Sequence, residues 1–83
     1  MERGHTVAMA ETILVADDEK NIVQLVRLYL SPEGYTVEGA PDGLAALDAA
    51  RRLRPALVIL DVMLPLLDGW EVLRRLRVEV TSP

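Results

Sequence analysis

Acidic residues follow two short apolar runs of this 83-residue sequence, and they are its clearest candidates for chemistry. Asp17 and Asp18 come directly after the run 12–16, and Asp61 comes directly after the run 56–60. If both runs are neighbouring parallel strands, their carboxyl ends meet at one edge of the sheet, about 4.8 Å apart. Carboxylates held so close repel one another, and either a bound proton or a divalent cation would relieve that repulsion.

Hard oxygen ligands of this kind favour Mg²⁺, Mn²⁺ or Ca²⁺. Mg²⁺ characteristically uses one or two carboxylates and leaves coordination positions for water and phosphate oxygens, which suits a site that accepts a phosphoryl group. A simpler interpretation also stays open at this point. Aspartates often end strands, face water and cap the helix that follows, with no bound ion at all.

The segments around these acids alternate between strand and helix patterns. Continuous apolar runs at 12–16 and 56–60 are typical of buried strands, and the alternation at 35–38 is typical of a half-exposed edge strand. Helical spacing covers 21–30, and Asp42 is a plausible N-cap for a second helix that ends at Arg52. A third helix opens at Asp68. This order predicts an α/β fold, with a parallel sheet covered by helices on both faces.

Helical periodicity also predicts which side chains face the sheet. For the first helix these are Ile22, Leu25, Val26, Tyr29 and Leu30. For the second and third helices they are Ala46, Leu47, Ala50, Leu53, Val72, Leu73 and Leu76. We further expect Trp70 to cap the edge of the core.

Composition excludes several classes of function. The chain has no cysteine, which excludes disulfides and thiolate metal sites, and its one histidine, His5, excludes a multi-histidine zinc site. A net charge of −4 argues against nucleic-acid binding by this chain. No stretch approaches the roughly 20 apolar residues of a membrane span, so we expect a cytoplasmic protein that does not enter membranes.

Taken together, the motifs resemble the receiver domain of two-component response regulators. The matching segments are 13–19, the Asp-Gly pair at 42–43, and 57–69, which carries an Asp-x-x-x-Pro-x-x-x-Gly pattern. The amino-acid sequence of these segments most resembles that of regulators with a winged-helix DNA-binding output domain. The resemblance implies a flavodoxin-like fold with sheet order 2-1-3. It gives a partial receiver domain over 12–77, an N-terminal tail over 1–11 and a frayed C-terminal tail over 78–83.

The resemblance also assigns expected roles to individual residues. Asp61 matches the phosphoacceptor, which would receive a phosphoryl group from a sensor histidine kinase. Asp18 and Asp61 match the carboxylates that bind Mg²⁺ directly, and Asp17 matches the acid that acts through water. Met63 matches the position that offers a backbone carbonyl to the metal. The proline and glycine of the Asp-x-x-x-Pro-x-x-x-Gly pattern match residues that shape the loop after the phosphoacceptor.

The sequence departs from the family pattern in ways that predict altered behaviour. Strands 4 and 5 have no match, and neither do the family's switch Thr or Ser and its fifth-strand lysine; the one lysine here, Lys20, follows the acidic pair. We therefore expect a truncated receiver with weak phosphotransfer. An apolar third strand left at the sheet edge predicts self-association. We do not expect an enzyme that turns over a small molecule.

Three other functions compete with the interpretation as a phosphorylated receiver. A haloacid-dehalogenase-type hydrolase also uses an aspartate at a strand end, but it needs a second acid two residues later, where this chain has Met63. A nucleotide-binding function lacks any glycine-rich phosphate loop. A receiver that binds partners without being phosphorylated remains open as an interaction module.

Overall fold

A three-stranded parallel sheet forms the centre of the computed structural model, which describes residues 10–81. The strands are β1 (Thr12–Ala16), β2 (Thr36–Ala40) and β3 (Leu57–Leu60). Their order is β2-β1-β3, with both pairings parallel, so the predicted order 2-1-3 is confirmed. Every residue of β1 except Thr12 is buried, because helices cover both of its faces and a strand lies on either side.

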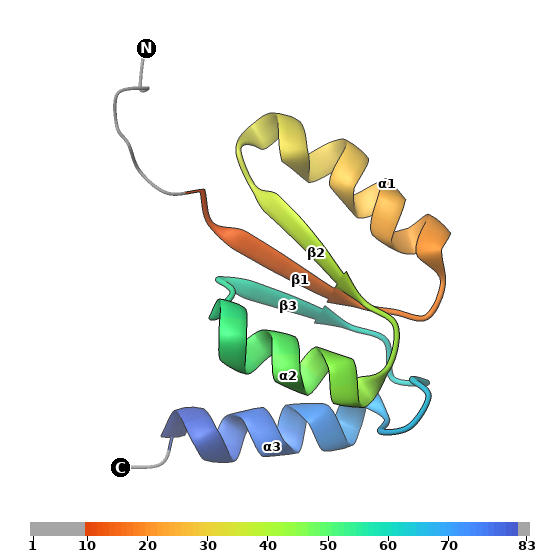
Figure 1. Cartoon of the computed structure of the whole chain (residues 1–83), viewed down its shortest axis with the longest axis vertical. Coiled ribbons are helices and arrows are strands. Elements are labelled where there is room, and N and C mark those ends of the chain that lie inside the picture. The colour runs from red at the N-terminus through yellow and green to blue at the C-terminus, as the bar shows by residue number, and fades with distance from the viewer. Residues whose placement is uncertain (1–9, 82–83) are drawn as a thin grey trace.

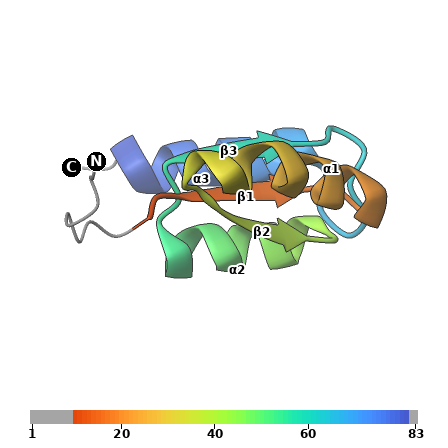
Figure 2. The same cartoon turned by 90° about the horizontal axis from the view of Figure 1, so that it is seen from above.

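Three α-helices cover the two faces of this sheet. Helix α1 (Lys20–Leu30), followed by a 3-10 turn (Ser31–Glu33), lies on one face. Helices α2 (Gly43–Leu53) and α3 (Gly69–Thr81) lie side by side on the other, as Figures 1 and 2 show. Helix α3 continues past Arg77, where we expected a frayed tail, because no glycine or proline interrupts it before position 83.

The larger part of the core lies between the sheet and the α2–α3 face. Leu14 and Ala16 of β1 are fully buried there against Ala46 of α2 and Val72 of α3. The alanine allows α2 to approach the strands closely, as its sequence predicts. The prediction for α3 holds for Val72, which is buried, and for Leu76, which packs against this core, whereas Leu73 is 36% exposed.

The opposite face of the sheet packs against α1, but through a different set of side chains from the one predicted. Val23, Val26 and Leu30 contact the buried residues of β1 and β2. Only Val26 and Leu30 belong to the predicted face. The prediction of Tyr29 as a core residue is wrong, since its side chain is 67% exposed. The predicted residues Ile22 and Leu25 are exposed as well.

Local sequence signals fix the ends of α2. Asp42 accepts a hydrogen bond from the backbone N–H of Ala45 at 2.7 Å, which confirms it as the N-cap. The last helical residue is Leu53, and the C-cap Arg54 has a left-handed backbone with a φ of 49°. Pro55 follows at once and prevents further helix.

Strand β3 is a sheet edge among the described residues. Its side chains alternate between exposed and half-buried, and Leu57 is 52% exposed. Val58 and Leu60 pack against the core on the α2–α3 side, whereas Leu57 and Ile59 point to the α1 side, where α1 lies over β1 and β2. Within residues 10–81, no helix is both long and apolar enough to cross a membrane.

Candidate metal centre at the carboxyl end of the sheet

Backbone pairing brings the acids of two strands to one point. Ala16 of β1 and Leu60 of β3 are paired, so Asp17 and Asp61 leave the sheet next to each other. Asp61 donates its backbone N–H to the Ala16 carbonyl at 2.9 Å, and Asp17 donates to the Ala40 carbonyl of β2 at 3.0 Å. These bonds extend the sheet one residue beyond each strand and fix the positions of both aspartates.

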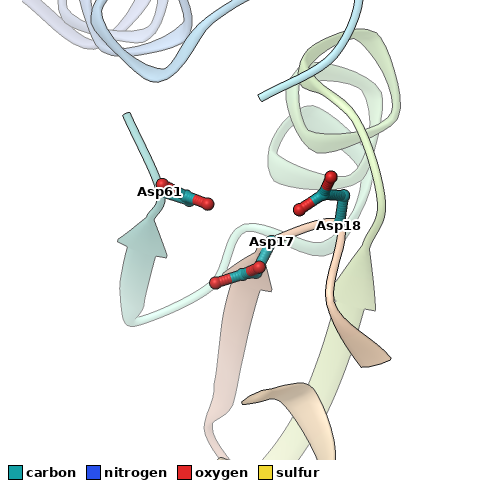
Figure 3. A group of neighbouring side chains, drawn as sticks. All are labelled: Asp17, Asp18 and Asp61. Atoms are coloured by element: carbon teal, nitrogen blue, oxygen red, sulfur yellow. The ribbon is translucent and has the colours of Figure 1, made fainter. Parts of the chain in front are cut away.

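Asp17, Asp18 and Asp61 form one carboxylate cluster. Each offers an oxygen that lies within 4.8 Å of the oxygens from the other two. Figure 3 shows the carboxylates of Asp18 and Asp61 pointing toward each other across a gap, with Asp17 beneath them. Asp18 is exposed, and the other two are half-buried. The sequence therefore predicted correctly that these three acids converge.

Two of the carboxylates are oriented by backbone N–H groups two residues further along the chain. Asp17 Oδ1 accepts the N–H of Glu19 at 2.9 Å, and Asp61 Oδ1 accepts the N–H of Met63 at 3.1 Å. Each bond uses one oxygen of the carboxylate and leaves the second oxygen available to a ligand. The Met63 side chain is 79% exposed, so that residue meets the site through its backbone.

The cluster carries repulsion that a cation would offset. At 4.8 Å, two unit charges repel by about 3.5 kcal/mol at an effective dielectric constant of 20 and by about 0.9 kcal/mol in water. Because the carboxylates are partly exposed, the cost per pair lies between these values. The donor set consists only of hard oxygens, which fits Mg²⁺ or another hard divalent cation rather than a softer metal.

The loop after Asp61 is held in place by two close backbone contacts. Gly69 donates its N–H to the Val62 carbonyl at 3.0 Å, and a Cβ at Gly69 would lie 2.4 Å from the Asp61 carbonyl oxygen. Gly43, the first residue of α2, donates to the Pro65 carbonyl at 3.0 Å. A Cβ at Gly43 would lie only 1.7 Å from the Leu67 carbonyl oxygen. Only glycine fits either contact.

Gly43 is the residue near the site whose importance the sequence did not reveal. It was visible as half of the Asp-Gly pair, but its contact joins α2 to a loop far away in sequence. Trp70 also differs from expectation: it is 66% exposed and does not cap the core. His5 lies outside the described residues.

Comparisons with known proteins agree with this geometry. The family model described as "Response regulator receiver domain" matches residues 13–83. The chain is 48% identical over 68 residues to the "Probable transcriptional regulatory protein TcrX" of Mycobacterium tuberculosis, a match that covers 82% of this chain and 29% of that protein. It is 51% identical over 69 residues to the "Alkaline phosphatase synthesis transcriptional regulatory protein PhoP" of Bacillus subtilis, covering 83% and 29%.

Solved structures show the same likeness. The chemotaxis response regulator CheY4 of Vibrio cholerae superposes with a TM-score of 0.80 at 35% identity, covering 87% of this chain and 60% of that one. The N-terminal domain of a response regulator receiver protein from Methanoculleus marisnigri gives 0.75 at 40% identity, covering 87% and 56%. The chain thus spans 29% of the length of the two curated relatives and little more than half of these two structures.

Proposed function

The chain belongs to the response regulator receiver domain family of two-component signal transduction, and from this we propose that Asp61 is its phosphoacceptor, served by Mg²⁺ bound among Asp17, Asp18 and Asp61. The convergence of the three carboxylates at the ends of β1 and β3 is the observation that carries the proposal. Receiver domains are signalling modules, and their phosphoryl donors are histidine kinases. We extend that donor class to this chain and place the protein in the cytoplasm.

Asp61 is suited to act as the nucleophile. Its Oδ1 is held by the Met63 N–H, so the second oxygen is the one that attacks phosphorus. That oxygen forms the new P–O bond while the bond from phosphorus to the leaving group breaks. The electron pair of that bond departs with the leaving group, which is an imidazole when the donor is a phosphohistidine.

Asp17 and Asp18 complete the carboxylate cluster and would hold the cation together with Asp61 and the Met63 backbone carbonyl. When bound, Mg²⁺ would offset the negative charge that the phosphoryl group and the aspartates bring together. We assign Asp17 to contact the Mg²⁺ ion through a water molecule, and Asp18 and Asp61 to bind the ion directly. The chain needs no general base in this scheme, because a carboxylate attacks without losing a proton.

We propose that the 83-residue polypeptide is phosphorylated slowly. Within these 83 residues the family's phosphate-contacting lysine has no counterpart, since the one lysine, Lys20, opens α1 directly after the acidic pair. The product is a modified receiver rather than a released small molecule, so we do not assign an enzyme activity. The curated relatives named above are transcriptional regulatory proteins, and we propose that this receiver serves a regulator of the same output class.

Intact mass spectrometry after incubation with acetyl phosphate and Mg²⁺ tests the proposal. We expect slow gain of one phosphoryl group by the wild-type chain and none by Asp61→Asn. EDTA should prevent the reaction. Asp48→Asn, which removes the same charge from the exposed side of α2, is the matched control and should react like the wild type. Equal labelling of wild type and Asp61→Asn would disprove the assignment of Asp61.

The second candidate function is a partner-binding module that needs no phosphorylation. Among residues 10–81, β3 has a neighbouring strand on one side only, and this edge favours the second candidate because it offers backbone groups to another polypeptide. Self-association through that edge is part of this candidate. A chain that stays unphosphorylated by acetyl phosphate yet associates in EDTA would favour it over the first.

A further inference from the structure

The loop after Asp61 contains a backbone conformation that its amino acid does not favour. Leu66 has a φ of 67°, in the left-handed region that residues with a Cβ seldom adopt. The Leu67 N–H donates to the Pro65 carbonyl at 2.7 Å, so Leu66 is the central residue of a three-residue γ-turn. A positive φ at the centre of such a turn marks its rarer and strained form. Glycine would adopt this φ without strain.

The leucine side chain does not compensate for this strain. It is 74% exposed, so burial of its apolar surface contributes little to stability. The side chains that hold the loop lie on either side of it in sequence: Leu64 is buried, and Leu67 packs against the core. The neighbours of Leu66 therefore impose its conformation. Backbone strain that is held in place by the surrounding structure is concentrated at functional sites.

One carbonyl group connects this turn to helix α2. The Pro65 oxygen accepts the Leu67 N–H within the turn, and it also accepts the N–H of Gly43, the first residue of α2, at 3.0 Å. The Leu67 carbonyl oxygen lies so close to Gly43 that no Cβ fits between them. Rotation of Leu66 to a negative φ would carry Leu67 away from the Pro65 carbonyl. The turn and its contact with α2 are therefore formed or lost together.

We propose that Leu66 is a positioning residue: its strain limits how firmly the loop closes on α2, and the closed loop is the form that binds Mg²⁺. The loop runs from Asp61 to Gly69, so its closure sets where the Met63 backbone carbonyl lies relative to the three carboxylates. Strain favours an open loop, and a cation that binds only the closed form loses affinity in proportion to the open fraction. The statement about Mg²⁺ rests on the proposed function, whereas the statement about loop closure concerns the metal-free chain.

Two substitutions at position 66 separate the strain from the loss of the leucine side chain. Leu66→Gly removes both, whereas the matched control Leu66→Ala removes the side chain but keeps a Cβ that opposes a positive φ. Hydrogen exchange of the Gly43 amide in EDTA reports loop opening, because its bond to the Pro65 carbonyl is lost in the open form. Leu66→Gly should slow this exchange by roughly twofold to tenfold, after allowance for the greater freedom of glycine in the open loop. Leu66→Ala should exchange like the wild type.

An amide at the other end of the sheet shows whether the effect is local. Ala56 donates its N–H to the Thr12 carbonyl at 2.8 Å, and its exchange should be the same in the wild type and both variants. Leu66→Asn should fall between Leu66→Gly and Leu66→Ala, because Asn adopts the left-handed region more readily than Ala. Equal exchange at Gly43 in Leu66→Gly and Leu66→Ala would overturn the proposal. Equal slowing at Gly43 and Ala56 would also overturn it, because global stability would then have changed rather than the loop.

Calorimetric titration with Mg²⁺ tests the link between the turn and the metal site. Leu66→Gly should bind Mg²⁺ at least about twofold more tightly than the wild type, and Leu66→Ala should bind it with an unchanged Kd. An equal Kd for Leu66→Gly and Leu66→Ala would overturn the role of Leu66 in positioning the site. Absence of Mg²⁺ binding by every chain, the wild type included, would overturn the proposed metal site and this role with it. Exchange at Gly43 in EDTA distinguishes the two failures, because it needs no metal.

Discussion

Replacement of Asp61 by asparagine should change the stability of the chain in opposite directions with and without Mg²⁺. Asn keeps the Oδ1 acceptor for the Met63 N–H, so the loop is still held, but it removes one of three clustered charges. Two of the three repulsive pairs disappear. For exposed carboxylates each pair costs near 1 kcal/mol, so we expect Asp61→Asn to raise the free energy of unfolding by roughly 1–2 kcal/mol in EDTA. The unfolded chain feels little of this repulsion, because Asp61 is distant in sequence from the other two acids.

Mg²⁺ should reverse the order of stability. A cation at ten times its Kd stabilises the wild-type chain by about 1.4 kcal/mol, and stabilisation grows with concentration. Asp61→Asn has lost one charged ligand and should gain much less. Urea unfolding, followed by circular dichroism in EDTA and across a Mg²⁺ titration, measures both effects. With a slope of about 1 kcal/mol per molar urea, the change in EDTA should move the midpoint by roughly 1 M or more.

Asp48→Asn is the control for the loss of a charge. Asp48 lies on the exposed side of α2, 3.7 Å from the Arg52 guanidinium, and such exposed pairs contribute at most about 1 kcal/mol. Its stability should change little, and its response to Mg²⁺ should equal that of the wild type. If Asp61→Asn is less stable than the wild type in EDTA, or gains as much from Mg²⁺, the reasoning from clustered charge is wrong.

Three further perturbations test other parts of the structure. Asp42→Ala removes the cap on α2 and should cost about 1 kcal/mol, seen as a lower urea midpoint at an unchanged slope. Gly43→Ala forces a Cβ against the Leu67 carbonyl and should cost more than about 2 kcal/mol while weakening Mg²⁺ binding; an unchanged Mg²⁺ affinity would show that the loop contact does not position the site. Hydrogen bonds from Arg74 first, and then Arg75, lower the pKa of Glu71 to about 2. Because the folded pKa is depressed, Glu71 stabilises the fold above pH 4.5 and loses that contribution as the pH falls toward 2, so Glu71→Gln should flatten the stability profile in that window; a titration of the Glu71 carboxyl with a midpoint near 4.5 would contradict this.

Much of the fold and of the carboxylate cluster was predictable from the sequence. Apolar runs that end in aspartate were enough to place two strands and, through the parallel order, the three acids at one edge. Asp42 predicted the start of α2, because helix capping depends on residues that are close together in the sequence. The exposed edge of β3 was also expected, from a strand order in which no further strand follows the third among the described residues.

The tertiary structure alone decided which faces are buried and which contacts fix the loop. Apolar residues of α1 occupy more than one side of the helix, so periodicity could not choose between Tyr29, which is exposed, and Val23, which packs on the sheet. Only the position of β1 and β2 beneath the helix makes that choice. In the same way, the need for glycine at position 43 arises from the Leu67 carbonyl, which approaches it only after the chain has folded. Local patterns record local interactions, whereas contacts between distant segments exist only once the strands and helices have been packed together.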